Sequence, residues 1–329
     1  MPNTFDWAQI DSPEKFDQIA LNRYRDQYTH VAVYREFCDH LGRSPERVDT
    51  VEQIPYLPIS FFKTHQVLRQ GSVLNRFFTS SATTGMVPSK HYVPRIEVYE
   101  ASFRLGWELF YGPVENFCVL ALLPSYLERT GSSLVYMAQD MIQRSKHPKS
   151  GFYLDQYQDL SETILHLEAT QTPTLLLGVT FALLDFAEQY PMNLKHTIVM
   201  ETGGMKGRGR EMIREEVHQK LSTAWGGLSI HSEYGMTELL SQAYSRGNGV
   251  FSCPPWMRVN LRDTEDPLTR LPEGQSGGID IIDLANVDSC SFISTQDLGR
   301  STGPGQFKVL GRFDHAEIRG CNLLVAVHQ

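Results

Sequence analysis

The chain has 329 residues, of which 41% are hydrophobic and 21% are charged, a composition typical of a folded globular enzyme with one large domain or two. Its formal net charge of −8 argues against a general nucleic-acid-binding protein, because such proteins present a basic surface. No apolar run approaches the roughly 20 residues that span a bilayer and no signal peptide is evident, so we expect a cytoplasmic protein with no membrane span and no nucleic-acid partner.

The five cysteines are far apart and odd in number, which fits neither a disulfide framework nor a zinc site. Four of them are expected to be small buried hydrophobic residues, namely Cys38, Cys118, Cys253 and Cys290. The fifth, Cys321, lies near the end of the chain and is considered separately below.

The N-terminal region is predicted to be helical. Ser12, Pro13 and Glu14 form the pattern of an N-cap, a proline at the first helical position and an acidic first turn. Apolar residues then recur with a helical period up to Gly42, and the proline-punctuated stretch 54–59 follows as an extended segment. We expect residues 1–75 to form a helical region packed on the main domain.

A hydroxyl-rich segment follows, in which five of the six residues 79–84 carry hydroxyl groups, before Gly85 and Lys90. Such a loop offers N–H and O–H donors to phosphate oxygens, and a lysine supplies the opposite charge. It is not a P-loop of the GxxxxGK[ST] kind, because no second glycine directly precedes the lysine. The alternative is a solvated loop between a buried strand and a helix. The residues predicted to contact phosphate are Thr79, Ser80, Ser81, Thr83, Thr84, Gly85 and Lys90.

Strands and helices alternate over the middle of the chain. Buried strands are predicted at 117–123, 174–177 and 196–200, and helices at 97–110, 132–143, 160–169, 181–189 and 210–221. Continuous apolar strands separated by helices indicate a parallel sheet covered on both faces. From about residue 250 short strands with many glycines and prolines predominate. We therefore predict an α/β fold with a helix-covered, mostly parallel sheet, a core at 76–250 and a smaller β-rich subdomain at 251–329.

Two glycine-rich motifs do not carry the chemistry that their patterns first suggest. Residues 274–278 match the G-x-S-x-G pattern of a nucleophile elbow, but a strand is predicted after them where an elbow needs a helix, so a β-turn is favoured. Residues 203–209 lack the spacing of a dinucleotide fingerprint. Gly203 and Gly204 nevertheless follow a buried strand, where α/β proteins bind ligands and where a missing side chain lets a flat ring approach the backbone.

Four segments stand in the order found in adenylate-forming enzymes, the superfamily of acyl-CoA synthetases and luciferases. They are the hydroxyl-rich loop with Lys90, residues 234–238 (YGMTE), the segment around Asp297 and residues 311–320 (GRFDHAEIRG). Residues 200–208, 232–245 and 319–323 more narrowly resemble the LuxE-type acyl-protein synthetases. The resemblance covers about residues 50–329. It implies the fold of the N-terminal domain of these enzymes, with ATP and Mg²⁺ as cofactors.

The resemblance also implies a role for each matching residue. The loop 79–85 with Lys90 would hold the β- and γ-phosphates of ATP. Thr237 would bind the α-phosphate, and Glu238 would hold Mg²⁺, which suits one carboxylate combined with phosphate oxygens. The residues that resemble the family's loop for the acid substrate are Pro124, Ser125, Tyr126, Gly131 and Ser132.

The adenosine part of ATP would meet a second group of residues. Gly203 and Gly204 would line the adenine, and Tyr234, followed by Gly235, would stack on it. Asp297 would accept hydrogen bonds from both ribose hydroxyls, with Arg312 close by. Attack of a carboxylate on the α-phosphorus depends mainly on positioning and on neutralisation of charge.

The resemblance departs from the larger superfamily members at the end of the chain. Those enzymes carry a further mobile domain with a catalytic lysine, whereas this chain stops nine residues after Gly320, so we expect that domain to be absent. In LuxE-type enzymes a cysteine near the C-terminus takes the acyl group as a thioester. Cys321 lies in the matching segment, and Arg319 beside it would lower the pKa of its thiol. The alternative is a buried cysteine beside a last strand at 323–327.

The sequence therefore predicts an acid–thiol ligase. It would activate a carboxylic acid, with a fatty acid favoured, as an acyl-adenylate and pass the acyl group to a protein cysteine. The first alternative is a ligase that transfers the acyl group to CoA or to an acyl-carrier protein. The second is a non-catalytic acyl-binding or scaffold subunit. The expected partners are the acid substrate and an acyl-accepting reductase, transferase or carrier protein.

Overall fold

The computed structural model describes residues 10–80, 87–124, 131–203 and 212–312. Helix α1 (Pro13–His30) begins where the sequence predicts, since the Ser12 hydroxyl accepts a hydrogen bond from the Lys15 backbone N–H at 3.2 Å. The next elements are α2 (Ala32–His40), β1 (Leu57–Pro58) and α3 (Phe61–Thr64). The helices predicted between Ser12 and Gly42 are confirmed.

The hydroxyl-rich segment lies in a β-hairpin. Strand β2 (Phe77–Thr79) pairs antiparallel with β3 (Lys90–Tyr92), and Thr79 is opposite Lys90. Residues 81–86, between the two strands, lie outside the described residues. The sequence-based alternative of a loop leading into a helix is therefore corrected, because a second strand precedes the helix α4 (Ile96–Tyr111).

One large sheet of twelve strands runs through the described residues in the order β11-β12-β13-β14-β10-β9-β8-β7-β6-β4-β5, with β1 beside β13. Its parallel half contains β4 (Cys118–Leu122), β5 (Gly151–Tyr153), β6 (Thr174–Val179), β7 (Thr197–Thr202) and β8 (His231–Tyr234). Its antiparallel half contains β9 (Ala243–Ser245), β10 (Val250–Ser252), β11 (Met257–Arg262), β12 (Ser276–Asp283), β13 (Phe292–Gly303) and β14 (Gln306–Arg312).

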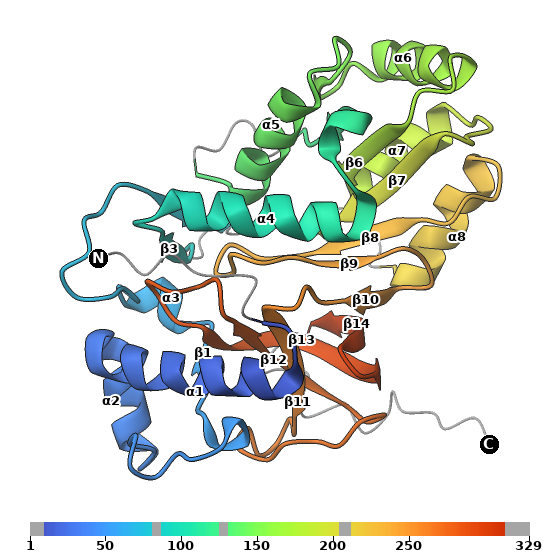
Figure 1. The fold of residues 1–329 in the computed structure, drawn as a ribbon. Helices are drawn as coiled ribbons and strands as arrows, with labels where there is room; N and C mark the ends of the chain where they lie inside the picture. Colours follow the sequence, from blue (N-terminus) through green and yellow to red (C-terminus); the bar gives the residue numbers. More distant parts are fainter. Residues whose placement is uncertain (1–9, 81–86, 125–130, 204–211, 313–329) are drawn as a thin grey trace, which may run out of the picture.

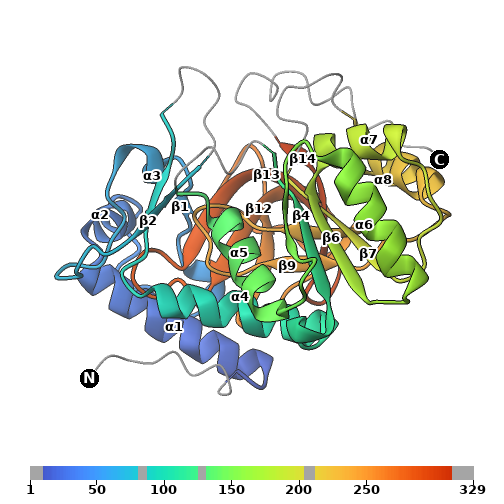
Figure 2. The same ribbon diagram turned by 90° about the horizontal axis from the view of Figure 1, so that it is seen from above.

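Helices cover the parallel half on both faces, as predicted (Figures 1 and 2). Along β8, His231 contacts Tyr111 of α4 on one face, and Ser232 contacts His218 of α8 on the other. The remaining helices begin and end close to the predicted positions: α5 (Ser133–Ser145), α6 (Tyr157–Ala169), α7 (Thr180–Gln189) and α8 (Arg214–Ala224). The expected α/β fold is confirmed.

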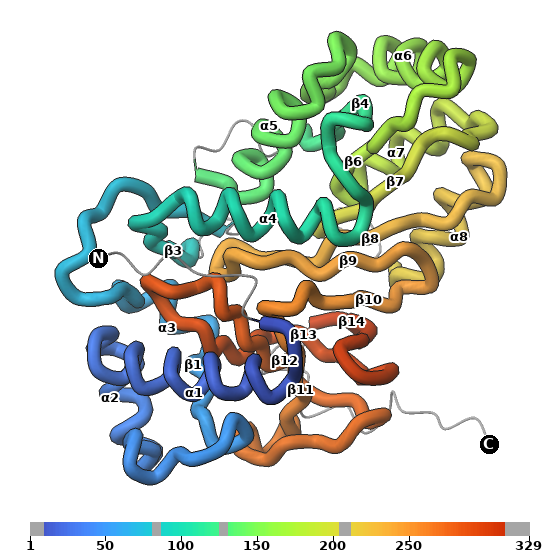
Figure 3. The backbone as a smooth tube through the Cα atoms, in the orientation of Figure 1, coloured from blue at the N-terminus to red at the C-terminus, as the bar shows by residue number. Residues whose placement is uncertain are grey.

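The N-terminal helices pack against the C-terminal strands (Figure 3). The buried Gln27 side chain donates to the Asn286 carbonyl oxygen at 2.8 Å and accepts from the Ser291 N–H at 2.9 Å. Strand β1 runs parallel to β13, with Leu57 opposite Ile293. The strands after residue 250 also continue the main sheet. The division into residues 1–75, 76–250 and 251–329 therefore stays a prediction.

Several smaller expectations can be compared with the structure. Gly274 lies in a turn with φ of +84°, and β12 begins at Ser276, so the expected turn is confirmed. Cys38, Cys118 and Cys290 are buried free thiols, while Cys253 is half-buried. None of the helices in the described ranges has both the length and the apolar character needed to cross a bilayer.

Candidate active site

The carboxyl ends of the parallel strands share one edge of the sheet, where ligands bind in α/β proteins. Pro124 follows β4, Gly203 follows β7 and Gly235 follows β8. Gly203 is exposed and has a φ of +76°, a conformation that favours glycine. The strand order thus brings three predicted binding positions to the same edge.

The phosphate hairpin, defined as residues 77–80 and 87–92, is attached to this edge. The Thr79 N–H donates to the Gly131 carbonyl oxygen at 2.8 Å. A Cβ atom at Gly131 would lie 3.0 Å from Thr79 Oγ1, and the φ of Gly131 is +101°. Ser132 caps α5 by accepting from the Val135 N–H at 3.3 Å. The hairpin therefore lies directly beside the loop predicted to contact the acid.

Within the hairpin, Ser80 and Ser89 form a small hydroxyl cluster. The N–H and the hydroxyl of Ser89 each donate to Ser80 Oγ at 2.9 Å. Lys90 follows and is exposed to solvent. The hairpin thus carries an exposed lysine next in sequence to a pair of fixed hydroxyl groups, and these are residue types that can bind phosphate.

The Ser89 hydroxyl connects the hairpin to Glu238. Burial raises the pKa of the Glu238 carboxyl, and the hydrogen bond with Ser89 and the charges of Arg312 and Lys63 partly oppose this effect. Thr237 lies in the same turn, half-buried, and its carbonyl oxygen is 2.8 Å from Nδ1 of His91. The residues predicted to bind the phosphates and the metal are therefore neighbours in the fold.

Tyr234, Asp297 and Arg312 form a second group. The Tyr234 hydroxyl donates to Asp297 Oδ2 at 2.8 Å, and its ring packs edge-on against Phe251 and Phe307. Asp297 is opposite Arg312 across β13 and β14, and Arg312 Nε is 3.7 Å from Asp297 Oδ1. Burial raises the pKa of Asp297, while Tyr234 and Arg312 counteract it. The three side chains predicted to bind adenosine thus lie together.

Two buried carboxyl groups lie next to this site, on β7 and β8. Glu201 accepts from Arg214 Nε at 3.0 Å. Although burial raises its pKa, His218 and Arg214 outweigh that effect and lower it overall. Glu233 accepts from the Thr202 hydroxyl, and burial raises its pKa to about 7. A Cβ atom at Gly235 would lie 2.4 Å from Glu233 Oε1, so a side chain there would push this carboxyl out of its present place.

Sequence reasoning missed several residues that support the site. Ser89 and His91 flank Lys90 directly, and their polar side chains are buried. Asn286 is also buried, in a stretch that mixes apolar residues with Asp283, Asp288 and Ser289. Neither stretch carried a local signal that would single out these residues. The predicted residues outside the described part of the chain are Ser81, Thr83, Thr84, Gly85, Ser125, Tyr126, Gly204 and Cys321.

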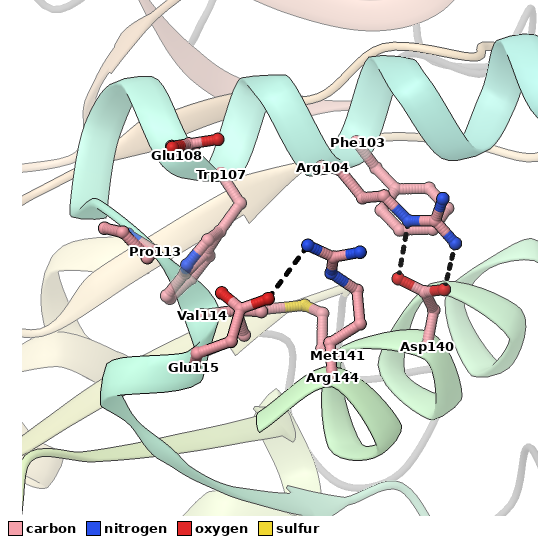
Figure 4. Close-up of a pocket in the computed structure, with 10 residues that line it drawn as sticks. All are labelled: Phe103, Arg104, Trp107, Glu108, Pro113, Val114, Glu115, Asp140, Met141 and Arg144. Carbon is pink, nitrogen blue, oxygen red and sulfur yellow. Dashed lines mark hydrogen bonds and ion pairs between the residues drawn. The ribbon is translucent and has the colours of Figure 1, made fainter. Parts of the chain in front are cut away.

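Figure 4 shows a separate small hollow bounded by α4, α5 and the turn Val114–Asn116. Its volume of about 30 Å³ is enough for bound water and small for a larger ligand. Arg104 pairs with Asp140 there, and Arg144 pairs with Glu115. No residue predicted to be functional lines this hollow, and it is too small for an acyl chain.

Comparison with known proteins gives a consistent result. Residues 2–125 match the sequence model of a family described as acyl-protein synthetase, LuxE. A long-chain-fatty-acid–luciferin-component ligase from Vibrio harveyi is 24% identical over 349 aligned positions, which cover 96% of this chain and 89% of that protein. The chain is therefore similar to a LuxE-type protein along nearly its whole length.

Solved structures share the fold. ATP-bound MatB from Rhodopseudomonas palustris has a TM-score of 0.55 and 21% identity, over 74% of this chain and 49% of MatB. The chain thus spans about half the length of MatB. A 2-hydroxyisobutyryl-CoA ligase in complex with 2-HIB-AMP and CoA has a TM-score of 0.69 and 15% identity, over 96% of this chain and 73% of that one. These likenesses show that the chain has the fold of adenylate-forming ligases.

Proposed function

We propose that this relative of the LuxE-type acyl-protein synthetases activates a carboxylic acid with ATP and transfers the acyl group to a protein cysteine. One observation carries the proposal: the phosphate hairpin, the turn with Thr237 and Glu238, and the pair of Asp297 and Arg312 meet at one edge of the sheet. These segments are distant in sequence, and the fold brings them together. The Vibrio harveyi relative, named as a fatty-acid ligase, favours a fatty acid as the substrate class.

The adenosine of ATP would bind between β7 and the end of β13. Gly203 offers open backbone to a flat ring, and Tyr234 supplies an aromatic wall held in place by Phe251 and Phe307. Asp297 accepts a hydrogen bond from the Tyr234 hydroxyl through Oδ2. A carboxylate has about four lone-pair positions, so it retains acceptors for two ribose hydroxyls. The guanidinium group of Arg312 would stabilise the negative charge of the Asp297 carboxylate.

The triphosphate would lie along the hairpin. Lys90 would supply a positive charge, and the hydroxyl groups of the same hairpin, Ser80 among them, would donate to phosphate oxygens. Glu238 would hold Mg²⁺, and this fits the donor set, because Mg²⁺ binds through one or two carboxylates together with phosphate oxygens and water. Burial raises the pKa of Glu238, which is the response expected of a carboxylate that lacks a strong cationic partner. Mg²⁺ would supply charge neutralisation of the phosphates.

The first chemical step joins the acid to AMP. A carboxylate oxygen attacks the α-phosphorus, the bond from that phosphorus to the bridging oxygen breaks, and pyrophosphate leaves with the electron pair. Lys90 would stabilise the charge that develops on the leaving group, and Thr237 would hold the α-phosphate. Gly131, at the end of the loop expected to hold the acid, contacts the hairpin at Thr79, so that loop would present the acid to the α-phosphorus.

The second step moves the acyl group to sulfur. A thiolate attacks the acyl carbonyl carbon, the carbon–oxygen bond of the mixed anhydride breaks, and AMP leaves. We assign the thiolate to Cys321, which lies outside the described residues. The described cysteines are poor candidates, because burial raises the pKa of even the half-buried Cys253 to about 12. An acyl-accepting reductase, transferase or carrier protein would then receive the group.

The test has two readouts. The protein is incubated with ATP, Mg²⁺ and a panel of fatty and aryl acids, and both pyrophosphate exchange and intact mass are measured. We expect exchange with at least one acid and an added acyl mass that neutral hydroxylamine removes. Cys321→Ala should retain exchange and carry no acyl group, while the matched control Cys253→Ala should acylate like the wild type.

The other outcomes discriminate between the alternatives. Formation of acyl-CoA or acyl-carrier protein without acylated enzyme would favour a ligase that uses CoA or a carrier protein. The fold shared with 2-hydroxyisobutyryl-CoA ligase is the reason to test CoA. Absence of exchange with every acid, together with binding of an acid, would indicate a non-catalytic acyl-binding subunit. Hydroxylamine-sensitive acylation of Cys321→Ala would place the acceptor on another cysteine.

A further inference from the structure

His91 is buried between the phosphate hairpin and the turn that carries Thr237 and Glu238. It belongs to β3, directly after Lys90, and its ring has no exposed surface. Nδ1 lies 2.8 Å from the Thr237 carbonyl oxygen, and Nε2 lies 3.1 Å from Asn286 Oδ1. The ring packs edge-on against Phe62. Both partner atoms are acceptors, so the neutral ring, which carries one N–H, donates to one of them while the other remains a close polar contact.

Asn286 completes the connection on the other side. It lies in the segment between β12 and β13, is 1% exposed, and its amide Nδ2 donates to the Glu238 carbonyl oxygen at 2.9 Å. The main chain of Thr237 is thus held by His91, and the main chain of Glu238 is held by Asn286. These two residues are the ones expected to bind the α-phosphate and the metal.

The end of β12 and the segment that follows it anchor both the turn and the hairpin. Asp283 accepts from the backbone N–H of Leu240 at 2.7 Å and of Ser241 at 3.0 Å, immediately after the turn. Asp288 forms a bidentate pair with Arg95, just beyond β3, at 2.7 Å for each contact. The platform segment, defined as residues 283–288, therefore fixes the hairpin and the turn relative to each other. None of its residues has a place in the proposed chemistry.

We propose that His91 and Asn286 are positioning residues of the adenylation site, which set the place of Thr237 and Glu238 relative to Lys90. The inference rests on the proposed function, because it concerns the same site. Its physical basis is that phosphoryl transfer depends on holding the reacting groups in line, so that a misplacement of about 1 Å lowers the rate by roughly 100-fold. A turn without regular secondary structure needs such external support.

Two substitutions at His91 and one at Asn286 separate positioning from packing. His91→Phe keeps the buried ring and its contact with Phe62 but removes both polar contacts. His91→Asn keeps an amide nitrogen near the place of Nδ1, so it can still donate to the Thr237 carbonyl oxygen. Asn286→Leu removes the support of Glu238 at similar volume. His231→Phe is the matched control, since His231 is on β8, its side chain contacts Tyr111 of α4, and it has no place in the proposed site.

The variants are compared by pyrophosphate exchange, ATP calorimetry and thermal melting. We expect His91→Phe and Asn286→Leu to lower kcat of exchange by roughly 10- to 100-fold with little change in the KM for the acid. His91→Asn should recover a large part of the loss. His231→Phe should stay within about 3-fold of the wild type, a change below 1 kcal/mol.

The inference is overturned if folded His91→Phe turns over like the wild type. It is also overturned if His91→Asn recovers nothing and the losses only follow the melting temperatures, because the ring would then serve packing alone. Failure of the proposed function looks different, since the wild type itself would show no exchange. If such a wild type still binds ATP, the affinity of His91→Phe for ATP decides: weaker binding supports the inference, and unchanged binding overturns it. If the wild type binds no ATP, both proposals are overturned.

Discussion

Replacing Glu233 by glutamine should remove a large pH-dependent term from the stability of this protein. Glu233 is buried on β8, accepts from the Thr202 hydroxyl, and has a pKa that burial raises from 4.5 to about 7. An acid with a raised pKa binds its proton more tightly in the folded state. The stability that it contributes is therefore fully present below the unfolded pKa and is lost as the pH rises through the folded pKa.

The magnitude follows from the two pKa values. A change from 4.5 to about 7 corresponds to about 3 kcal/mol. Most of it, about 2.5 kcal/mol, is lost between about pH 5 and pH 8.5, because those values lie on either side of the folded pKa. Glutamine keeps an oxygen to accept from Thr202 and does not ionise. Between pH 5 and pH 8.5, the free energy of unfolding of Glu233→Gln should therefore fall by about 2.5 kcal/mol less than that of the wild type.

The assay is urea unfolding of both proteins at pH 5, pH 7 and pH 8.5. Glu201→Gln is the matched control, because Glu201 is a neighbouring buried carboxyl whose pKa is lowered by His218 and Arg214 despite burial. Its stabilisation is present above the unfolded pKa and is lost as the pH falls, so this variant should be most damaging at high pH. Equal pH dependence of Glu233→Gln and the wild type would refute the reasoning, since the Glu233 carboxyl would then be ionised in both states alike.

Four further substitutions test other parts of the site. Asp297→Asn should weaken ATP binding by at most about 3 kcal/mol and leave pyrophosphate binding unchanged in calorimetry, and an equal loss for both ligands would make Asp297 structural. Glu238→Gln should abolish carboxylate-dependent pyrophosphate exchange while the unfolding transition stays cooperative, and retained exchange would argue against the metal role. Gly131→Ala should lower stability by about 1–3 kcal/mol in urea, because φ is +101° and its Cβ would crowd Thr79, and unchanged stability would mean that the loop relaxes freely. Asp283→Asn should cost about 2–3 kcal/mol, since its amide would face donors that the carboxylate now accepts, and a smaller loss would show that the platform segment rearranges.

The secondary structure of the parallel half was accessible from local patterns. Ser12 and Pro13 mark the start of α1, and the apolar runs at β4, β6 and β7 identify buried strands, because both signals depend on neighbours in sequence. The β2–β3 hairpin was not predicted. Its strands have three residues each, and contacts with Gly131 and the turn at Thr237 hold it in place.

Some residues of the candidate site could likewise be predicted from the sequence, and others could not. Residues of the recurring motifs, such as Tyr234 and Asp297, could be proposed from the sequence, and the fold places them together. His91 and Asn286 could not, because their partners lie 146 and 195 positions apart in the chain. A hydrogen bond between distant segments leaves no periodic pattern of apolar and polar residues in the sequence around either partner. Its only trace in the sequence is a polar residue where burial would favour an apolar one.

The packing of α1 and α2 against β13 has a consequence for synthesis on the ribosome. The rings of Tyr24 and Tyr34 contact Phe292, with centroid distances of 6.4 Å and 6.0 Å. At about 5–20 residues per second, roughly 10–50 s pass between translation of Tyr34 and translation of Phe292. During that time the nascent helices lack the strand that covers them, and their apolar faces are open to chaperones or to other nascent chains.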